Sequence, residues 1–377
     1  MKIAISARTL LSEPRDGIAW FTYEFISRMV RSHPEDTFYL ISDKRYGKPP
    51  VYSRNVKYIH LPPRNRHPFI ALLWHQVMLK NVLRRLQADV FIGPDGFIPL
   101  GCSIPCIAVI HDLNHCHRPG DIPFVTRHFF RYFFPLYARQ AARIVTVSQF
   151  SAADISSVYG IPNEKIDVVY NGVSGQFFPV TEEEAESYRL KLTGGRPYFV
   201  FVSNFSPRKN VPTLIKAFDR FRAGTDTDYA LVLAGSRLYL TGELDKALRE
   251  SPYGDSVIFT GRLSREELRK AYGSAAAFVF VPWFEGFGIP VVEAMKCGTP
   301  CIISDNSSLP EVSGGAGLCV SAADTEAIAA AMTRLADEPA LRRRLKDEGM
   351  KNALRFSWDN TAAQMYESIV KTLDANA

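Results

Sequence analysis

Two glutamates stand on either side of a glycine-rich turn. The stretch Glu-Gly-Phe-Gly-Ile-Pro-Val-Val-Glu runs from Glu285 to Glu293 and follows an apolar run, 275–281. This order predicts a strand, a turn and a helix, because Pro290 suits the first helical turn and glycine lets the backbone approach a ligand closely. The N–H groups of such a helix start favour an anion, most commonly a phosphate. Carboxylates beside a phosphate usually bind hydroxyls, so the stretch favours a ligand with both, a sugar nucleotide.

Two adjacent cations, Arg208 and Lys209, occupy a second loop between an apolar run and a helix. The run is Tyr198–Val202, and the helix should begin near Pro212. Arginine offers a fork of donors and lysine a mobile charge, so the pair suits a diphosphate and can stabilise it as it leaves. The carboxyl ends of parallel strands share one edge of a sheet. We therefore expect this loop on the same rim as the Glu285 turn.

Candidate binding residues also follow predicted strands in the first half of the chain. Gly17 precedes a helix after Lys2–Ser6 and would permit close approach of a phosphate. His111 follows Ile107–Ile110, where it could touch a substrate or carry a proton. The loop after it also holds His115, Cys116 and His117. Zinc is an alternative for this set, but the loop has no partner cluster elsewhere, and we expect no metal.

Length and composition indicate a globular protein of two domains. The chain has 377 residues, of which 46% are hydrophobic and 22% charged. No apolar run reaches the roughly 18 residues of a spanning helix, and the first run is too short for a signal peptide. The six cysteines form no C-x-x-C pair. Reduced thiols in the cytoplasm are the expectation.

Positive charge is concentrated in the first half. Residues 1–180 hold 21 Lys and Arg against 13 Asp and Glu, and region 44–85 holds ten basic residues and no acidic one. Such a patch could meet nucleic acid, an anionic membrane or a phosphorylated substrate. Its segment 68–86 looks helical, which leaves open a core-packed helix with a solvated basic tip or a peripheral contact with the cytoplasmic face of a membrane. We expect no nucleic-acid partner.

Short apolar runs alternate with helical patterns along the chain, which predicts βαβ units and parallel sheets. The strands expected in the first half are Lys2–Ser6, Thr37–Ile41, Val56–His60, Val90–Ile92, Ile107–Ile110 and Arg143–Val147. Those expected in the second half are Tyr198–Val202, Leu231–Ala234, Val257–Thr260, Ala276–Val281, Cys301–Ser304 and Gly317–Val320. A linker is placed at about 170–180. Neither a G-x-G-x-x-G after the first strand nor a P-loop occurs, which disfavours dehydrogenases and P-loop enzymes.

Four motifs together resemble glycosyltransferase family 4, whose members are retaining enzymes of the GT-B fold. These motifs are 285–300, Pro207-Arg-Lys-Asn210, His111-Asp112 and Leu309-Pro-Glu311-Val. The resemblance covers nearly the whole chain. It implies an α/β protein with two Rossmann-like parallel-sheet domains that face each other across a cleft. The implied division is an acceptor-binding domain 1–175, a nucleotide-sugar-binding domain 176–357, and a C-terminal helix 358–377 that packs back on the first domain.

The same resemblance implies roles for individual residues. Glu293 would bind the ribose hydroxyls, and the sugar hydroxyls would be held by Glu285 and the backbone of the turn, which comprises Gly286, Phe287, Gly288 and Ile289. Arg208 and Lys209 would hold the diphosphate with Gly17, and His111 would contact the donor sugar. Family members are metal-independent, so no cofactor is expected. The chain departs from many relatives at Asp16-Gly17, at Asn204 in place of arginine, and at 281–284, where Val-Pro-Trp-Phe replaces the usual Pro-Ser before the first glutamate. Asn204 is still expected among the donor-binding residues.

The predicted activity is transfer of a hexose, mannose or glucose, from a nucleoside-diphosphate sugar to a glycan or lipid-linked acceptor in cell-surface polysaccharide synthesis. Double displacement would need a carboxylate nucleophile about 5 Å from its partner, and none is evident. Front-face transfer is therefore favoured, with the leaving diphosphate taking the acceptor proton. The alternatives are a sugar-nucleotide epimerase on the same fold and a non-catalytic sugar-nucleotide-binding protein. A glycosidase is disfavoured, because hydrolysis gives no reason to bind a diphosphate.

Overall fold

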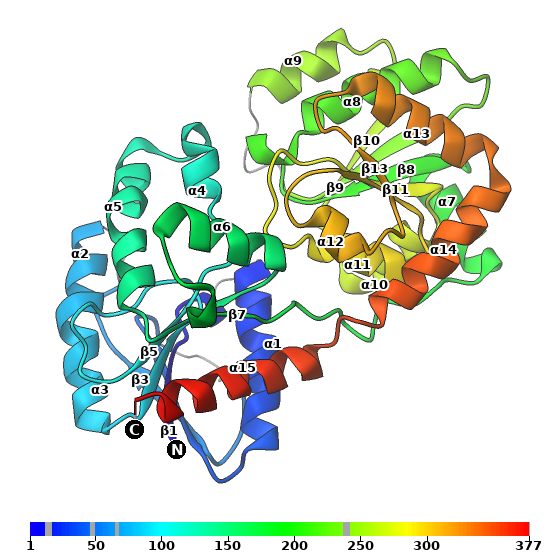
Figure 1. Ribbon diagram of the computed structural model, residues 1–377. Coiled ribbons are helices and arrows are strands. Elements are labelled where there is room, and N and C mark those ends of the chain that lie inside the picture. Colours follow the sequence, from blue (N-terminus) through cyan, green and yellow to red (C-terminus); the bar gives the residue numbers. More distant parts are fainter. Residues whose placement is uncertain (12–16, 46–49, 65–67, 237–241, 377) are drawn as a thin grey trace. The chain divides into compact units, whose positions relative to one another are not determined.

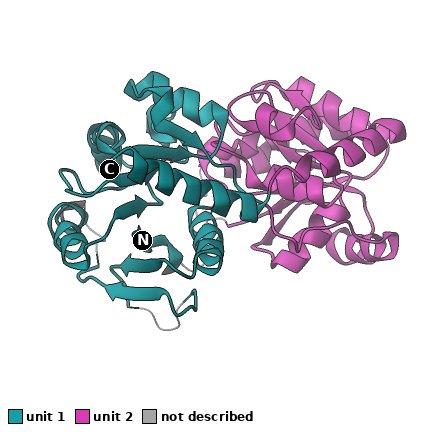
Figure 2. Cartoon of the chain, turned by 60° about the horizontal axis from the view of Figure 1, so that its bottom comes forward, with its two compact units in different colours: residues 1–172, 357–377 teal, residues 173–356 magenta. Residues whose placement is uncertain are grey.

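The chain folds into two compact units, each built on a parallel sheet. The computed structural model describes residues 1–11, 17–45, 50–64, 68–236 and 242–376. Unit 1 comprises residues 1–172 and 357–377, and unit 2 comprises residues 173–356 (Figure 2). The chain thus passes between the units at 172/173 and again at 356/357.

Seven parallel strands form the sheet of unit 1, in the order β3-β2-β1-β4-β5-β6-β7. They are β1 (Lys2–Ser6), β2 (Thr37–Ser42), β3 (Val56–His60), β4 (Val90–Gly93), β5 (Cys106–Val109), β6 (Arg143–Thr146) and β7 (Ile166–Val168). In the centre, Ile3 of β1 pairs with Phe38 of β2 and Val90 of β4, and all three side chains are fully buried. Helices cover such a sheet, which explains why its central strands are largely apolar runs.

The helices of unit 1 flank this sheet (Figure 1). They are α1 (Gly17–Ser32), α2 (Pro68–Leu73), α3 (Lys80–Leu86), α4 (Asn114–His117), α5 (Phe124–Gln140), α6 (Gln149–Tyr159) and α15 (Trp358–Asp374). The helix predicted over 68–86 is present, but its middle, η2 (Trp74–Leu79), is π-helical. Shorter 3-10 turns are η1 (Thr9–Leu11), η3 (Pro119–Asp121) and η4 (Asn163–Lys165). A strand was not predicted at β7, because its three residues include the polar Asp167.

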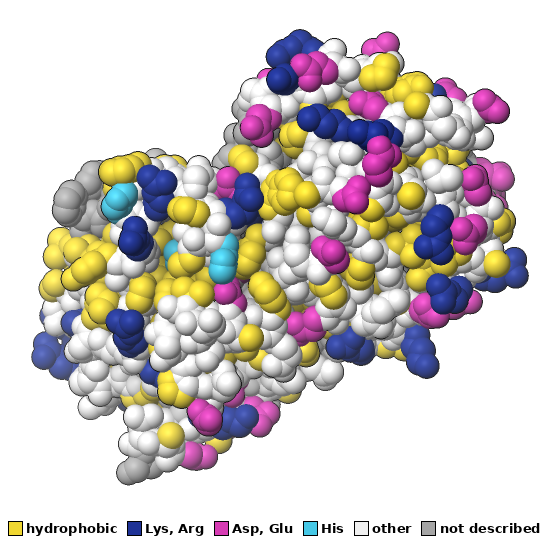
Figure 3. All heavy atoms as spheres, turned by 45° about the horizontal axis from the view of Figure 1, so that its top comes forward, with side chains coloured by type: hydrophobic (Ala, Val, Ile, Leu, Met, Phe, Trp, Pro, Cys, Tyr) yellow, Lys and Arg dark blue, Asp and Glu magenta, His cyan; other side chains and the backbone are white. Residues whose placement is uncertain are grey.

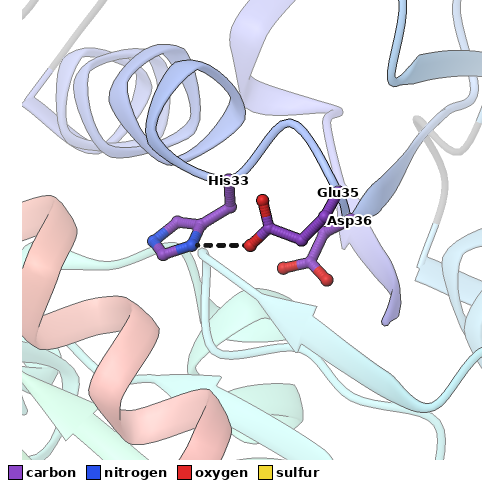
Figure 4. Close-up of side chains that lie close together, drawn as sticks. All are labelled: His33, Glu35 and Asp36. Carbon is purple, nitrogen blue, oxygen red and sulfur yellow. Dashed lines mark hydrogen bonds and ion pairs between the residues drawn. The ribbon is translucent and has the colours of Figure 1, made fainter.

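The C-terminal helix α15 belongs to unit 1, where polar contacts tie it to α1 and the loop before β2. Tyr366 donates a hydrogen bond to Asp36 at 2.7 Å and stacks on His33 with ring centroids 3.4 Å apart. Figure 4 shows His33, Glu35 and Asp36 together, with the His33–Glu35 contact of 3.2 Å dashed. These three side chains have the ligand types of a metal site, but they already bind one another, Tyr366 and the amino group of Met1. Their evident role is to hold α15.

Six parallel strands form the sheet of unit 2, in the order β10-β9-β8-β11-β12-β13. They are β8 (Tyr198–Val202), β9 (Ala230–Ala234), β10 (Val257–Gly261), β11 (Ala277–Phe280), β12 (Cys301–Ser304) and β13 (Leu318–Val320). The order reverses between β8 and β11, which lie side by side. Ligands of open α/β sheets bind at such a switch point, beyond the carboxyl ends of the strands. The loops that follow β8 and β11 are therefore the places to look for a site in this unit.

The helices of unit 2 are α7 (Glu182–Thr193), α8 (Val211–Ala223), α9 (Gly242–Glu250), α10 (Arg265–Gly273), α11 (Ile289–Lys296), α12 (Leu309–Ser313), α13 (Thr325–Asp337) and α14 (Pro339–Ala353), with 3-10 turns η5 (Pro207–Lys209) and η6 (Gly254–Ser256). Two of them begin with capping boxes, Thr181 with Glu184 and Ser264 with Glu267. None of the helices in the described ranges combines the length and the apolar character that a bilayer-spanning segment requires.

Candidate active site

The loops after β8 and β11 meet through an ion-pair cluster of Arg208, Lys209 and Glu285. Arg208 Nη1 lies 2.9 Å from Glu285 Oε2, and Lys209 Nζ binds the same oxygen. The arginine also donates to the carbonyl of Phe284 at 3.2 Å, and its own carbonyl accepts from Trp283 at 2.8 Å. The side chains of Lys209 and Glu285 are only 6% and 14% exposed. The structure therefore brings together the cations and the first glutamate, which were predicted to share one rim.

Electrostatics keep Glu285 ionised. Burial of its carboxyl acts to raise the pKa, but the charges and hydrogen bonds of Lys209 and Arg208 outweigh this, and the pKa lies below its ordinary value. Two cations and one carboxylate leave a net positive charge beside the turn. That balance suits an anionic group of higher charge, such as a diphosphate.

Asn210 fixes the cationic loop in place, a role that was not predicted from the sequence. Its backbone is left-handed, with a φ of 61°, and its side-chain amide donates to the carbonyls of Val281 and Ala322 at 2.9 and 2.8 Å. These bonds tie the loop to the end of β11 and to the segment before α13. An asparagine at the residue before a helix is the signal that could have revealed it, because asparagine tolerates positive φ.

The turn before α11 requires glycine at position 288. Gly288 has a φ of 92°, and a Cβ there would lie 2.5 Å from a methyl carbon of Leu309. Helix α11 begins at the next residue, Ile289, with Pro290 in its first turn. The buried Phe287 packs edge-on against Phe356 at 5.4 Å. The predicted strand, turn and helix are thus confirmed over this stretch.

Ser308 supports the same turn from the following loop. Its hydroxyl donates to the carbonyl oxygen of Glu285 at 2.9 Å. The residue is fully buried. Gly286, between the glutamate and Phe287, is also buried. The backbone of the turn is therefore held at Glu285 by the loop that precedes α12.

Glu293 lies one helical turn into α11, in an environment unlike that of Glu285. The hydroxyl of Tyr272 donates to its Oε2 at 3.2 Å. Burial raises the pKa of Glu293 to about 7, against the opposing effects of the Tyr272 bond and the charge of Arg265. Both partners come from α10, whose sequence gave no sign of them. The two glutamates of the motif therefore differ in charge state near neutral pH.

A pocket of about 290 Å³ adjoins the cationic loop. It is lined by the loop itself, the start of α8, helix α9 and Trp283. Trp283 belongs to one of the three places at which the chain departs from many family members, and its side chain lines this pocket. Asn204 lies on the same loop, where it is exposed and its side chain accepts a hydrogen bond from the backbone of Ser206 at 3.3 Å.

In unit 1, His111 follows β5 as predicted. Its Nε2 lies 2.9 Å from the carbonyl oxygen of Pro94, so this nitrogen carries the proton, and its ring packs edge-on against Phe21 of α1 at 5.1 Å. Gly17 is the first residue of α1, and a Cβ there would meet no atom of the described residues within 4 Å. Asp16, named with it as a departure, lies outside the described residues. The described part of unit 1 thus leaves room beside Gly17, and none of its atoms requires glycine there.

The other histidines of the His111 loop have protein partners. His115 Nε2 lies 2.8 Å from the hydroxyl of Tyr159, which is also 3.6 Å from the sulfur of Cys116. His117 binds the carboxylate of Asp154 at 2.8 Å. The side chains of His115, Cys116 and His117 therefore contact helix α6, which carries both Tyr159 and Asp154.

A polar cluster at the switch point of unit 1 was not foreseen. Arg8, after β1, lies 3.1 Å from His75 Nε2 and 3.6 Å from a carboxylate oxygen of Asp95, after β4. Burial, with the charge of Arg8, lowers the pKa of His75 to about 3, so this ring is neutral. Asp95 is next to Pro94, the residue that binds His111. Only the fold brings Arg8 and His75 together, since 67 positions separate them in the sequence.

Models of known protein families match both the first and the second half of the chain. A family model described as Glycosyltransferase Family 4 matches residues 15–176, and one described as Glycosyl transferases group 1 matches residues 182–352. The chain is 25% identical to O-antigen chain mannosyltransferase B of Escherichia coli, over 97% of its own length and 98% of the relative's. The chain belongs to the glycosyltransferases.

Other relatives of this glycosyltransferase support the assignment. It is 34% identical to the MMP alpha-(1->4)-mannosyltransferase of Mycolicibacterium hassiacum, over 63% of its length and 57% of the relative's. Among solved structures it resembles sucrose-phosphate synthase from Thermosynechococcus elongatus, with a TM-score of 0.78, 19% identity and full coverage of both chains. Anabaena Alr3699/HepE in complex with UDP-glucose gives a TM-score of 0.75 at 17% identity, covering 98% of this chain and 100% of that one. The fold is GT-B, with two Rossmann-like domains.

The pKa of Glu293 gives this glycosyltransferase a pH-dependent stability. Because the folded pKa of about 7 lies above the ordinary 4.5, the ionised side chain costs stability increasingly as the pH rises between these values. Glu293→Gln keeps the acceptor for Tyr272 and removes the cost. We expect the variant to be more stable by on the order of 2 kcal/mol at about pH 8 and equal to wild type near pH 4. Urea unfolding at both pH values measures the difference, and a gain that does not vary with pH would contradict this explanation.

Proposed function

We propose that this glycosyltransferase moves a hexose, mannose first among the candidates, from a nucleoside-diphosphate sugar to a hydroxyl of a glycan or lipid-linked acceptor, with retention at the anomeric carbon. The observation that carries the proposal is the cluster of Arg208, Lys209 and Glu285 beside the start of α11, at the switch point of unit 2. Support for mannose comes from relatives that are named mannosyltransferases, and support for the donor class from a structural neighbour solved with UDP-glucose.

The donor would lie along the turn, with its charge next to the cations. Arg208 and Lys209 both bind Oε2 of Glu285, so Oε1 can accept a hydroxyl of the transferred sugar. The backbone N–H groups of Phe287, Gly288 and Ile289, at the start of α11, would hold further oxygens. Glu293 would accept from the ribose hydroxyls. As part of this proposal, Gly17 keeps its predicted place at the phosphates and His111 at the sugar, and Asn204 remains among the donor-binding residues.

Sugar transfer would be promoted by stabilising the negative charge that develops on the leaving diphosphate. As the bond between the anomeric carbon and the diphosphate oxygen lengthens, negative charge grows on that oxygen, and the two cations stabilise it. The acceptor oxygen then bonds to the same face of the sugar while its proton passes to the departing diphosphate. Glu285 is a poor candidate for a nucleophile, because two cations bind its carboxylate and lower its pKa. Front-face transfer is thus the route that this geometry favours.

The product distinguishes this function from its rivals. The test incubates purified protein with a nucleoside-diphosphate sugar, such as GDP-mannose, and a panel of mannoside acceptors. The product should be a glycoside with the anomeric configuration of the donor, which proton NMR can measure. Free nucleoside diphosphate should appear in equal amount. An epimerase would instead convert the donor without any acceptor, and a binding protein would release no nucleotide. An inverted product would overturn the retaining mechanism.

We further propose that no metal ion takes part, because two side-chain cations stand where a divalent ion would neutralise the diphosphate. Transfer should therefore continue at the same rate after treatment with EDTA, and added Mg²⁺ or Mn²⁺ should not raise it more than about twofold. A chelated sample that regains activity only with a divalent ion would contradict this part of the proposal.

A further inference from the structure

Helix α5 carries more apolar surface than its packing uses. Phe124, Val125 and Tyr132 are 67%, 62% and 66% exposed. At 3.6 residues per turn, positions 124, 128, 131 and 132 fall on one side of the helix. His128 and Arg131 at these positions are exposed as well. We call the following residues the α5 surface: Phe124, Val125, Arg127, His128, Arg131 and Tyr132.

The other side of α5 already supplies the core of unit 1. Phe130, Phe134 and Tyr137 pack around Phe97, with ring centroids 6.3, 5.4 and 5.8 Å from it. Of these, Phe134 and Tyr137 are buried. The fold of unit 1 therefore does not explain the exposed rings at the start of the helix. An apolar surface of this kind marks a contact with something outside the chain.

The α5 surface is also cationic. The helix contains three arginines, one histidine and no acidic residue. Arg127 lies over the ring of Phe124 at 5.4 Å, and the ring of His128 lies 4.1 Å from it. The acidic residue just before the helix, Asp121, is neutralised by Arg118 at 2.7 Å. Figure 3 shows hydrophobic, basic and histidine side chains gathered on a face of unit 1.

The segment formed by α2 and η2 also carries exposed apolar side chains. The ring centroid of His75 in η2 lies 5.2 Å from that of Phe97. The ring centroid of Phe97 lies 6.1 Å from that of Phe129 in α5. On the same segment Leu73 and Val77 are 51% and 49% exposed. They belong to region 44–85, for which the sequence left open either a core-packed helix with a basic tip or a peripheral membrane contact. The structure adds α5, which the charge pattern of the sequence did not single out.

We propose that the α5 surface docks the protein onto the surface of an anionic lipid bilayer. Aromatic and aliphatic side chains enter the boundary between headgroups and acyl chains, and the arginines bind the lipid phosphates. A glycan would instead require carboxylates or amides for its hydroxyls, and the helix offers no carboxylate. Docking goes beyond sugar transfer itself, because it determines where the enzyme works. It would place the enzyme beside acceptors that are anchored in lipid.

Vesicle flotation of the full chain tests the proposal. Wild type should float with phosphatidylcholine vesicles that contain phosphatidylglycerol, and not with phosphatidylcholine alone. Arg127→Glu with Arg131→Glu should lower the bound fraction about tenfold or more. Phe124→Ser with Tyr132→Ser should lower it by a similar factor, because the apolar anchors are lost. All these side chains are at the surface, and thermal melts should show folded variants.

A matched control comes from α7, where Leu190 is 68% exposed and the side chain of Lys191 is 72% exposed. Leu190→Ser with Lys191→Glu should leave flotation unchanged. The proposal is overturned if wild type does not float, or if the α5 variants float as wild type does. It is also overturned if wild type is a dimer that the Phe124 variant makes monomeric, since the surface would then bind a second copy. Transfer to a soluble acceptor should be unaffected by the α5 variants, which separates this outcome from failure of the proposed function.

Discussion

Replacing Lys209 with alanine should lower kcat about a hundredfold to a thousandfold while the donor KM changes little. The side chain is 6% exposed, and its ammonium group lies over the ring of Phe280 at 5.0 Å. A charge in such a site is weakly screened by water, so it acts strongly on the charge that develops as the diphosphate leaves. The ground-state diphosphate keeps Arg208 as a partner, which is why binding should suffer less than turnover.

Two companion variants make the Lys209 measurement specific. Lys209→Arg retains the charge in a different shape and should recover part of kcat. Lys191→Ala removes an exposed lysine of the same unit and should leave kcat unchanged. Thermal melts establish whether each variant is folded. Unchanged kcat in folded Lys209→Ala would remove this residue from the reaction.

Glu285→Gln should lower the stability of the apo protein by about 3 kcal/mol, because it leaves two cations in a partly buried cluster without their counter-charge. As a control, Glu326→Gln removes a surface ion pair with Arg220. The side chains of Arg220 and Glu326 are 51% and 69% exposed, so the change should cost well under about 1 kcal/mol. Nucleoside diphosphate restores negative charge beside the cations. It should therefore raise the melting temperature of Glu285→Gln more than that of wild type, while sugar transfer by the variant falls.

The effect of Glu285→Gln also has a defined pH dependence. The folded pKa of Glu285 lies below the ordinary value of 4.5, so its ion pairs stabilise the protein fully above that pH. This stabilisation is lost as the pH falls through the folded pKa. Urea unfolding should show the full difference between wild type and variant at neutral pH and a difference that narrows only in acid. A difference that disappears between neutral pH and 4.5 would contradict the ion-pair explanation.

Much of the fold could be predicted from the sequence, because both sheets are parallel and buried. The runs at β1, β8 and β12 have the same bounds as the structure, since buried parallel strands are continuous apolar stretches. The bounds of β3 also agree, although this edge strand has no fully buried residue. The three-residue edge strand β7 was missed because it is short and partly polar. Strand order was also out of reach, since it depends on contacts between distant segments. The location of each switch point therefore came only from the structure.

In the candidate site, too, some features could be predicted from the sequence and others required the structure. Glu285, Arg208 and Lys209 were selected by residue type and by their places after apolar runs, and they do lie together. Their mutual ion pairs were not foreseen, because a single sequence shows which charges are present and not which ones touch. The raised pKa of Glu293 depends on burial and on Tyr272, and the Arg8–His75–Asp95 cluster depends on the fold of unit 1. Such properties arise from three-dimensional surroundings.

Donor binding is the most direct test of the central claim, because it needs no knowledge of the acceptor. A panel of nucleoside-diphosphate sugars should contain at least one that raises the melting temperature of wild type, and the rise should increase with ligand concentration as RT ln(1 + [L]/Kd) requires. The same sugar should give a much smaller rise with folded Glu293→Ala, which lacks the carboxylate assigned to the ribose. If no sugar nucleotide shifts wild type, or if the shift survives unchanged in the variant, unit 2 does not bind its donor in this way.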